Sequence, residues 1–178
     1  VLTFDHDHVP TEHLETLVAE GINVAPPPEA LIHAQDKLTM RRRLEALGAP
    51  VPRFSAVSSG GEAEAFAEQI GGSVVIKTVR GGYDGRGVVM AADAEEAREI
   101  VQRYLADGVE VMIEERVAMK RELAALVARS PFGQGAAWPV VQTVQRDGIC
   151  VEVIAPAPEL DDEVAAAAQQ LALRLADE

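Results

Sequence analysis

The sequence predicts an α+β fold with two sheets, in which helices alternate with strands early in the chain and antiparallel strands dominate later. Three observations support this prediction. Met40, Leu44 and Leu47 recur at helical spacing. The β-branched, mostly apolar run 73–79 is typical of a buried strand. Asp147-Gly148, between two strand-like runs, is typical of a hairpin turn.

The first half is expected to mix strands and helices whose ends are marked by capping residues and glycines. Its elements are a strand at 1–4, a helix from the N-cap Thr11 to Gly21, a proline connector at 22–30, a helix from the cap Asp36 to Gly48, a strand at 51–57, a helix at 61–72, and a strand at 73–79.

The second half is expected to be richer in strands. Its elements are a return strand at 87–92, a helix from Asp93 to Gly108 with Glu96 in capping-box spacing, strands at 109–115, 121–129, 139–145 and 149–155, and a final helix capped by Asp161. Val164, Ala168, Leu171 and Leu175 form an apolar stripe on that helix, which we expect to face the core.

Composition limits the classes of function. The 178 residues carry a net charge of -13, which argues against nucleic-acid or anionic-membrane partners, because these favour clustered positive charge. The single cysteine, Cys150, cannot form a disulfide framework, and we expect a cytoplasmic protein. No apolar run approaches membrane-spanning length. Because Val1 is not an initiator methionine and the sequence stops with a helix, we expect a piece of a longer chain.

The segment 75–90 carries the clearest chemical signal. Lys77 ends one β-like run, a glycine cluster follows, and a second β-like run begins at Val88. Walker and dinucleotide-binding loops both need a helix after the glycines, and the residues from Val88 favour a strand. In a glycine-rich hairpin, backbone N–H groups can approach phosphate oxygens while a lysine adds positive charge. We therefore predict a nucleotide-phosphate site, with a plain surface hairpin as the alternative.

The acidic segment 114–122 is a second candidate. Glu114 and Glu115 end an apolar strand, and Glu122 begins the next one. A strand end with a short link can hold an adenine through backbone groups, while carboxylates take ribose hydroxyls or a metal-bound phosphate. The alternative is an exposed acidic turn.

Three other features are interpreted as having no chemical role. His6 and His8 alternate on the expected first strand without a clear third ligand, so we expect no metal site there. The arginines 41–43 are interpreted as the solvated face of their helix, and Cys150 as a small buried hydrophobe.

Four segments together resemble the ATP-grasp enzymes: QDKLTMRRRLEALGAPVPRF, VVIKTVRGGYDGRGV, VMIEERVAMKRELAALVARS and WPVVQTVQRDGICVEVIAPAP. They are most similar to the 5-(carboxyamino)imidazole ribonucleotide synthase family of purine biosynthesis. The resemblance implies two α/β subdomains with the nucleotide between them. It divides the chain into a remnant of an N-terminal domain at 1–34, a small subdomain at 35–113, and the first part of a large subdomain at 114–178 that lacks its C-terminal part.

The resemblance also implies site residues. The ATP contacts are Lys37 and Lys77 at the phosphates, Gly82, Tyr83, Asp84, Gly85, Arg86, Gly87 and Val88 in a loop over them, Glu114, Glu115, Arg116 and Val117 at the adenine, Glu122 at the ribose, and Gln145, which lies where many relatives carry a histidine. The second-substrate contacts are Tyr83, Arg86 and Asp7, with Asp5 as the alternative to Asp7. Lys77, Tyr83 and Arg86 are implied as catalytic groups.

The implied activity is the ATP-dependent carboxylation of 5-aminoimidazole ribonucleotide with bicarbonate, through carboxyphosphate, with release of ADP and phosphate. ATP and Mg²⁺ are the implied cofactors, and the family's metal ligands would follow Glu178, so this piece alone is expected to be inactive. A homodimer is the implied assembly. The alternatives are a formate-dependent transformylase of purine synthesis, a biotin carboxylase, or a noncatalytic nucleotide-binding module.

Overall fold

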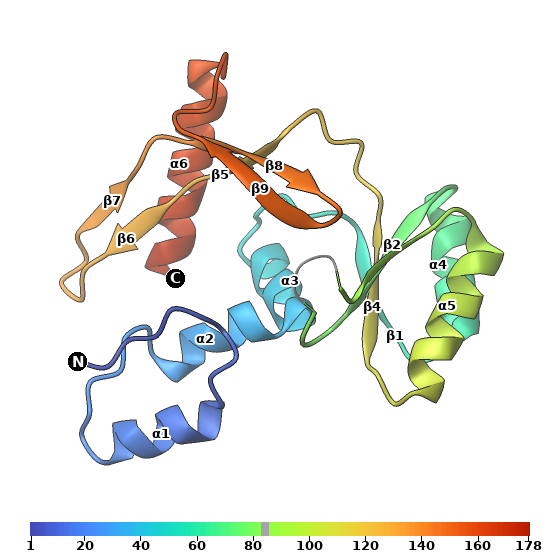
Figure 1. The fold of residues 1–178 in the computed structure, drawn as a ribbon, viewed down its shortest axis with the longest axis horizontal. Coiled ribbons are helices and arrows are strands. Elements are labelled where there is room, and N and C mark those ends of the chain that lie inside the picture. Colours follow the sequence, from blue (N-terminus) through green and yellow to red (C-terminus); the bar gives the residue numbers. More distant parts are fainter. Residues whose placement is uncertain (83–85) are drawn as a thin grey trace. The chain divides into compact units, whose positions relative to one another are not determined.

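The computed structural model describes residues 1–82 and 86–178, so Tyr83, Asp84 and Gly85 lie outside the described residues. The described chain forms two compact units, one of residues 1–82 with 87–116 and the other consisting mainly of Val117–Glu178 (Figure 1). Within the described ranges, no helix is long and apolar enough to cross a membrane.

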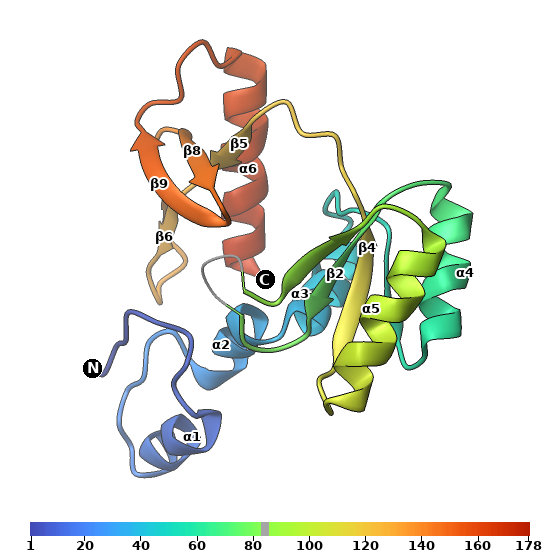
Figure 2. The same cartoon turned by 45° about the vertical axis from the view of Figure 1, so that its right-hand side comes forward.

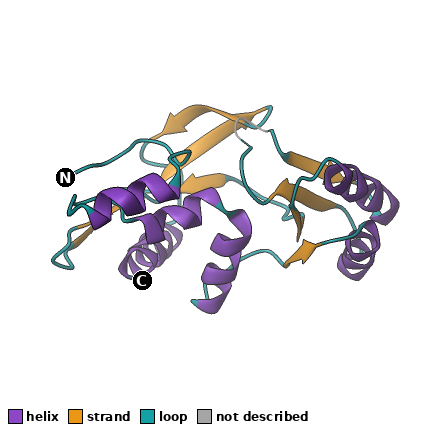
Figure 3. Ribbon diagram, turned by 90° about the horizontal axis from the view of Figure 1, so that it is seen from below, coloured by secondary structure: helices purple, strands orange, loops and turns teal. Residues whose placement is uncertain are grey.

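The first unit is built on one antiparallel sheet with the strand order β1-β4-β2-β3. Figures 1 and 2 show α4 and α5 side by side on one face of this sheet, and Figure 3 shows the same pair from below. The elements are α1 (Thr11–Ala19), α2 (Pro28–Gln35), α3 (Lys37–Ala46), β1 (Phe54–Val57), α4 (Gly60–Ile70), β2 (Val74–Thr78), β3 (Val88–Ala91), α5 (Ala94–Ala106) and β4 (Val111–Glu115).

The core of this unit lies between the sheet and the helices α4 and α5. Val74 and Ile76 of β2 are fully buried there, together with Ala63, Ala97 and Val101 of the two helices. Small residues let the helices approach closely. At Gly60, a Cβ atom would lie only 2.6 Å from Cγ of Gln102, so glycine alone fits without movement of the neighbouring helix.

Most of the predicted helix boundaries in this unit are confirmed. Asp36 and Asp93 cap α3 and α5 by accepting hydrogen bonds from the backbone N–H groups of Thr39 at 2.8 Å and Glu96 at 2.9 Å. The prediction for α1 is wrong by one residue, because Pro10 occupies the N-cap position and Thr11 is already helical.

The N-terminal region differs from the prediction in two further respects. The expected strand at 1–4 is only an isolated bridge between Leu2 and Val24. The expected proline connector contains the helix α2, which starts at Pro28. Proline is compatible with the first helical position, where its missing N–H would have no partner within the helix.

The second unit contains two small antiparallel sheets, with the strand orders β5-β8-β9 and β6-β7. Its elements are β5 (Glu122–Ala124), β6 (Val127–Arg129), β7 (Gly135–Ala137), β8 (Val141–Arg146), β9 (Ile149–Ile154) and α6 (Asp162–Asp177). The predicted turn at Asp147-Gly148 is confirmed, with φ angles of 51° and 79°. The described residues therefore form three sheets rather than the predicted two, because the expected strand 121–129 is divided into β5 and β6 and a hairpin partner, β7, was not predicted.

Two burial predictions in this unit are wrong. No residue of α6 is buried, and Val164 of the predicted core stripe is 48% exposed. The helix packs on the narrow β6-β7 hairpin, which is too small to cover its apolar stripe. Cys150 is exposed as well, because β9 is an edge strand whose residues are almost all exposed.

Candidate functional site

The face of the first sheet that is turned away from α4 and α5 carries the predicted phosphate-binding lysine of β2. Buried and half-buried residues alternate along this strand, and Lys77 lies between the buried Ile76 and Thr78. Residues directly opposite each other in an antiparallel pair share a face. Lys77 is opposite Met112 and Val75 is opposite Glu114, so the side chains of Lys77 and Glu114 are diagonal neighbours on one face.

Glu114 is the centre of a buried ion cluster on this face. The residue is only 4% exposed, and its carboxylate pairs with Lys77 through Oε1 and accepts a 3.0 Å hydrogen bond from Nε of Arg41 through Oε2. Burial by itself raises the pKa of Glu114, but the hydrogen bonds and charges of Lys77 and Arg41 outweigh it and hold that pKa below its ordinary value. The carboxylate is therefore ionised, and the alternative of an exposed acidic turn is wrong for Glu114.

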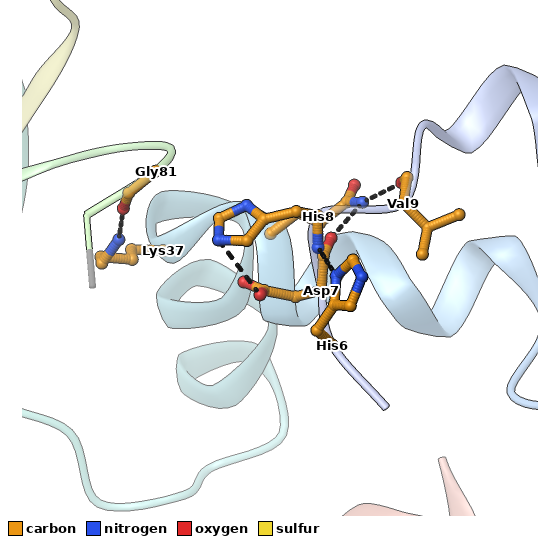
Figure 4. A network of polar contacts seen from close by, with 7 residues as sticks. His6, Asp7, His8, Val9, Lys37 and Gly81 are labelled. Atoms are coloured by element: carbon orange, nitrogen blue, oxygen red, sulfur yellow. Dashed lines mark hydrogen bonds and ion pairs between the residues drawn. The ribbon is translucent and has the colours of Figure 1, made fainter. Parts of the chain in front are cut away.

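The N-terminus of α3 places a second lysine beside the glycine loop. Nζ of Lys37 donates a 2.7 Å hydrogen bond to the carbonyl oxygen of Gly81, as Figure 4 shows, and the backbone N–H of Lys37 donates to the carbonyl of Val79 at 2.9 Å. Desolvation first, and then the positive charge of Lys77, lower the pKa of Lys37. Two neighbouring lysines thus form a local positive site in an acidic chain, as an anionic ligand requires.

A salt bridge next to Lys37 fixes the start of the glycine loop. The carboxylate of Asp36 caps α3 and also accepts a 3.1 Å hydrogen bond from Nε of Arg80. Burial raises the pKa of Asp36, but the hydrogen bonds from Thr39 and the charge of Arg80 lower it overall. One side chain therefore orients both the lysine-bearing helix and the chain that enters the loop.

The return of the loop is fixed by a close contact between Thr78 and Gly87. The backbone N–H of Thr78 donates to the carbonyl of Gly87 at 2.9 Å. Gly87 has a φ of +75°, and a Cβ atom there would lie 2.5 Å from Oγ1 of Thr78. Both the backbone conformation and the contact demand glycine.

We expect Gly87→Ala to weaken ATP binding and to lower the unfolding free energy by about 1–3 kcal/mol, because an alanine adds the strain of a positive φ to a steric clash. Gly81→Ala is the matched control. Gly81 also has a positive φ, of +68°, but no atom lies within 4 Å of its Cβ position. Thermal unfolding and calorimetric ATP titration should show the larger loss for Gly87→Ala. Equal losses would mean that the contact with Thr78 is unimportant.

A polar hollow of about 330 Å³ lies in the same unit, lined by residues that include Asp7, His8, Gln35, Arg80 and Gly81. Nε2 of Gln35 donates 2.8 Å hydrogen bonds to the carbonyls of Asp7 and Val9 and so fixes the shape of this segment. Figure 4 shows the side chains of Asp7 and His8 next to each other, with Nε2 of His8 3.7 Å from Oδ1 of Asp7. Asp7 lines the hollow, which favours it over Asp5 as the substrate contact.

The remaining predicted residues are dispersed. Glu115 is half-buried and bonded to Nε of Arg53 at 2.6 Å. Arg116 and Val117 are exposed, and the first unit ends in the sequence at Arg116. In the glycine loop, Arg86 and Val88 are both exposed beside Gly87, and Gly82 is exposed next to Gly81.

Two further predicted nucleotide contacts lie on strands of the second unit. Glu122 begins β5, is half-buried and pairs with Thr143 of β8, while Gln145 is exposed at an irregularity in β8. Tyr83, Asp84 and Gly85 lie outside the described residues, so their predicted roles remain predictions.

Sequence reasoning missed Arg41. The interpretation of the arginines 41–43 as a solvated face is wrong for this residue, whose side chain is only 19% exposed. A signal was present, since Arg41 follows Lys37 by four residues and must share its helix face. A basic pair on one face of a helix can serve the same anionic site.

Comparisons with known proteins agree with this geometry. The chain is 65% identical to the N5-carboxyaminoimidazole ribonucleotide synthase of Mycobacterium bovis over 178 residues, which is 100% of this chain and 42% of that protein. The carboxyaminoimidazole ribonucleotide synthase of Aspergillus clavatus complexed with ATP has a TM-score of 0.88 at 29% identity, over 98% of this chain and 46% of that one. A structure of the synthase from the same organism with ADP and 5-aminoimidazole ribonucleotide has a TM-score of 0.88 at 27% identity, over 99% of this chain and 45% of that one.

The chain thus spans less than half the length of these relatives. The model of the ATP-grasp domain matches residues 42–178, which include β2, the glycine loop and Glu114. The ATP-grasp fold implied by the resemblance is confirmed, and the chain belongs to the ATP-grasp family.

Proposed function

We propose that the intact protein is an ATP-dependent ligase that carboxylates 5-aminoimidazole ribonucleotide to its N5-carboxyamino derivative in purine biosynthesis. The observation that carries this proposal is the 65% identity, over the whole chain, with a relative that bears this name. The geometry supports it, since two lysines flank a glycine loop and a separate polar hollow adjoins Gly81.

In the proposed reaction, an oxygen of bicarbonate attacks the γ-phosphorus of ATP. The bond to the β-phosphate oxygen breaks, and ADP leaves with its electron pair. The exocyclic amine of the ribonucleotide then attacks the carboxyl carbon of carboxyphosphate, forming a C–N bond, losing a proton and releasing phosphate. Negative charge gathers on the phosphoryl oxygens, so positive groups fixed in advance lower the barrier.

The chain supplies several of these groups in the proposal. Lys37 and Lys77 hold the phosphates, and the loop Gly82–Val88 covers them, with Arg86 and Tyr83 reaching the second substrate and the bicarbonate-derived group. Exclusion of water by this loop would protect carboxyphosphate from hydrolysis. Asp7, which lines the polar hollow, is the proposed contact to the ribonucleotide on that side.

The adenosine part of ATP is assigned to the segment in which the first unit ends in the sequence and to two residues of the second unit. The segment 114–117 holds the adenine, Glu122 the ribose hydroxyls, and Gln145 lies near the nucleotide. Because the carboxylate of Glu114 is already paired with Lys77 and Arg41, its adenine contact in this proposal is made by backbone groups.

Magnesium is part of the proposed reaction as the counter-ion of ATP and as a Lewis acid at the phosphates. The described residues contain no group of three His, Cys, Asp or Glu side chains that could hold a metal ion, and we assign no step of the reaction to it. A homodimer and a cytoplasmic location, both expected from the sequence, also remain part of the proposal.

The test is ADP formation by the intact protein with ATP, Mg²⁺ and bicarbonate, with and without 5-aminoimidazole ribonucleotide. We expect the ribonucleotide to stimulate ADP formation and to be carboxylated in equal amount. Stimulation by biotin, or by formate with another ribonucleotide, would move the protein to a different ATP-grasp activity. Nucleotide binding without stimulated ADP formation would indicate a noncatalytic module.

A further inference from the structure

Arg41 shares the buried carboxylate of Glu114 with Lys77 without competing for it. Nε of Arg41 donates to Oε2 at 3.0 Å, whereas the ammonium group of Lys77 pairs with Oε1. The three side chains come from α3, β4 and β2, and all three belong to the first unit. Each cation therefore keeps its own oxygen, and either one can stay when the other moves away.

The charges of this cluster do not cancel. One carboxylate, with a side chain 5% exposed, faces two cations whose side chains are 19% and 21% exposed. A buried carboxylate that loses its only cation is strongly destabilised. With Arg41 in place, Lys77 can leave Glu114 for another anion while the carboxylate stays paired.

We propose that Arg41 is a positioning residue for nucleotide binding, which orients Glu114 and keeps it neutralised while Lys77 turns from this carboxylate to the phosphates of ATP. Arg41 acts through Glu114 and Lys77 and need not touch the nucleotide. The inference rests on the proposed nucleotide site at Lys77.

Without Arg41, a phosphate and Glu114 would compete for Lys77. Any phosphate contact would then leave the buried carboxylate unpaired, so part of the binding free energy would be lost. The loss should depend on the phosphates of the ligand, because only they attract Lys77. A purely structural role for Arg41 predicts no such dependence.

The experiment measures the dissociation constants of a nonhydrolysable ATP analogue and of adenosine for the intact protein. We expect Arg41→Met to raise the dissociation constant of the ATP analogue by roughly tenfold or more, which corresponds to the loss of one hydrogen bond to a charged group. The dissociation constant of adenosine should stay unchanged. Arg42→Met is the matched control, since Arg42 is the exposed neighbour on the same helix, and its affinities should stay at the wild-type level. Arg41→Lys keeps the charge and should restore most of the lost affinity.

A double-mutant cycle identifies the residue through which Arg41 acts. In a Lys77→Met background, Arg41→Met should cause no further loss of affinity for the ATP analogue. The inference would be overturned if Arg41→Met weakened binding of the ATP analogue as much in the Lys77→Met background as in the wild type. It would also be overturned if Arg41→Met weakened adenosine binding as much as binding of the ATP analogue. Should Arg41→Met show no cooperative melting transition, Arg41→Gln replaces it in each measurement, with the same outcomes for and against.

The same measurements separate this inference from the proposed function. If Lys77→Met leaves the affinity for the ATP analogue unchanged, the nucleotide site itself is misplaced and the proposed function loses its structural support. If Lys77→Met weakens binding but Arg41→Met does not, only the role of Arg41 is wrong.

Discussion

Lys77→Met is expected to raise the dissociation constant of ATP by about 10- to 100-fold, which corresponds to the loss of one or two charge-assisted hydrogen bonds to phosphate. The folded state should persist, because Arg41 still donates to the buried Glu114 after Lys77 is gone. We expect the unfolding free energy to fall by only about 1–2 kcal/mol. Calorimetric titration and thermal unfolding of the intact protein measure the two quantities separately.

Lys77→Arg is the informative companion to this variant. The guanidinium keeps the positive charge but is larger and planar, so it should retain more ATP affinity than methionine and less than lysine. An ATP affinity of Lys77→Met equal to that of the wild type would remove Lys77 from the site. A collapse of the folded state would show instead that Arg41 cannot balance Glu114 by itself.

Local signals were enough to predict most of the first unit. The caps Asp36 and Asp93 satisfy backbone donors at the starts of their helices, which is a contact between residues a few positions apart. The β-branched, apolar run that forms β2 and includes the buried Val74 and Ile76 is an equally local signal. Such features follow from the neighbouring sequence alone, so the pattern predicts them correctly.

Contacts between distant segments could not be predicted in this way. Arg41 and Glu114 are 73 positions apart, and no local pattern shows that an arginine of α3 will contact a carboxylate near the end of β4. The predictions that Cys150 and Val164 are buried were wrong for a related reason. Apolar character predicts burial only when another element covers the residue, and within the described part of the chain most residues of β9 stay exposed and none of α6 is buried.

Glu114→Gln is expected to cause the largest loss of stability, about 2–4 kcal/mol at neutral pH, because it leaves Lys77 and Arg41 close together without their shared anion. The loss should lie near the lower end for buried ion pairs, since both cations are about one-fifth exposed. Glu115→Gln is the matched control. Glu115 pairs with Arg53, whose side chain is 61% exposed, and such a pair contributes only about 0–1 kcal/mol.

The pH dependence of this loss follows from the pKa of Glu114. Its folded-state pKa lies below the ordinary value of 4.5, so the unfolded chain binds the proton more tightly than the folded one. The stabilisation by the ionised Glu114 is complete above the pKa of this residue in the unfolded chain. It disappears as the pH falls through the lower pKa of the folded state. Denaturant unfolding should therefore show the difference between wild type and Glu114→Gln shrinking below about pH 4.5. A difference that stays constant down to acid pH would mean that the carboxylate owes its stabilising effect to packing and not to its charge.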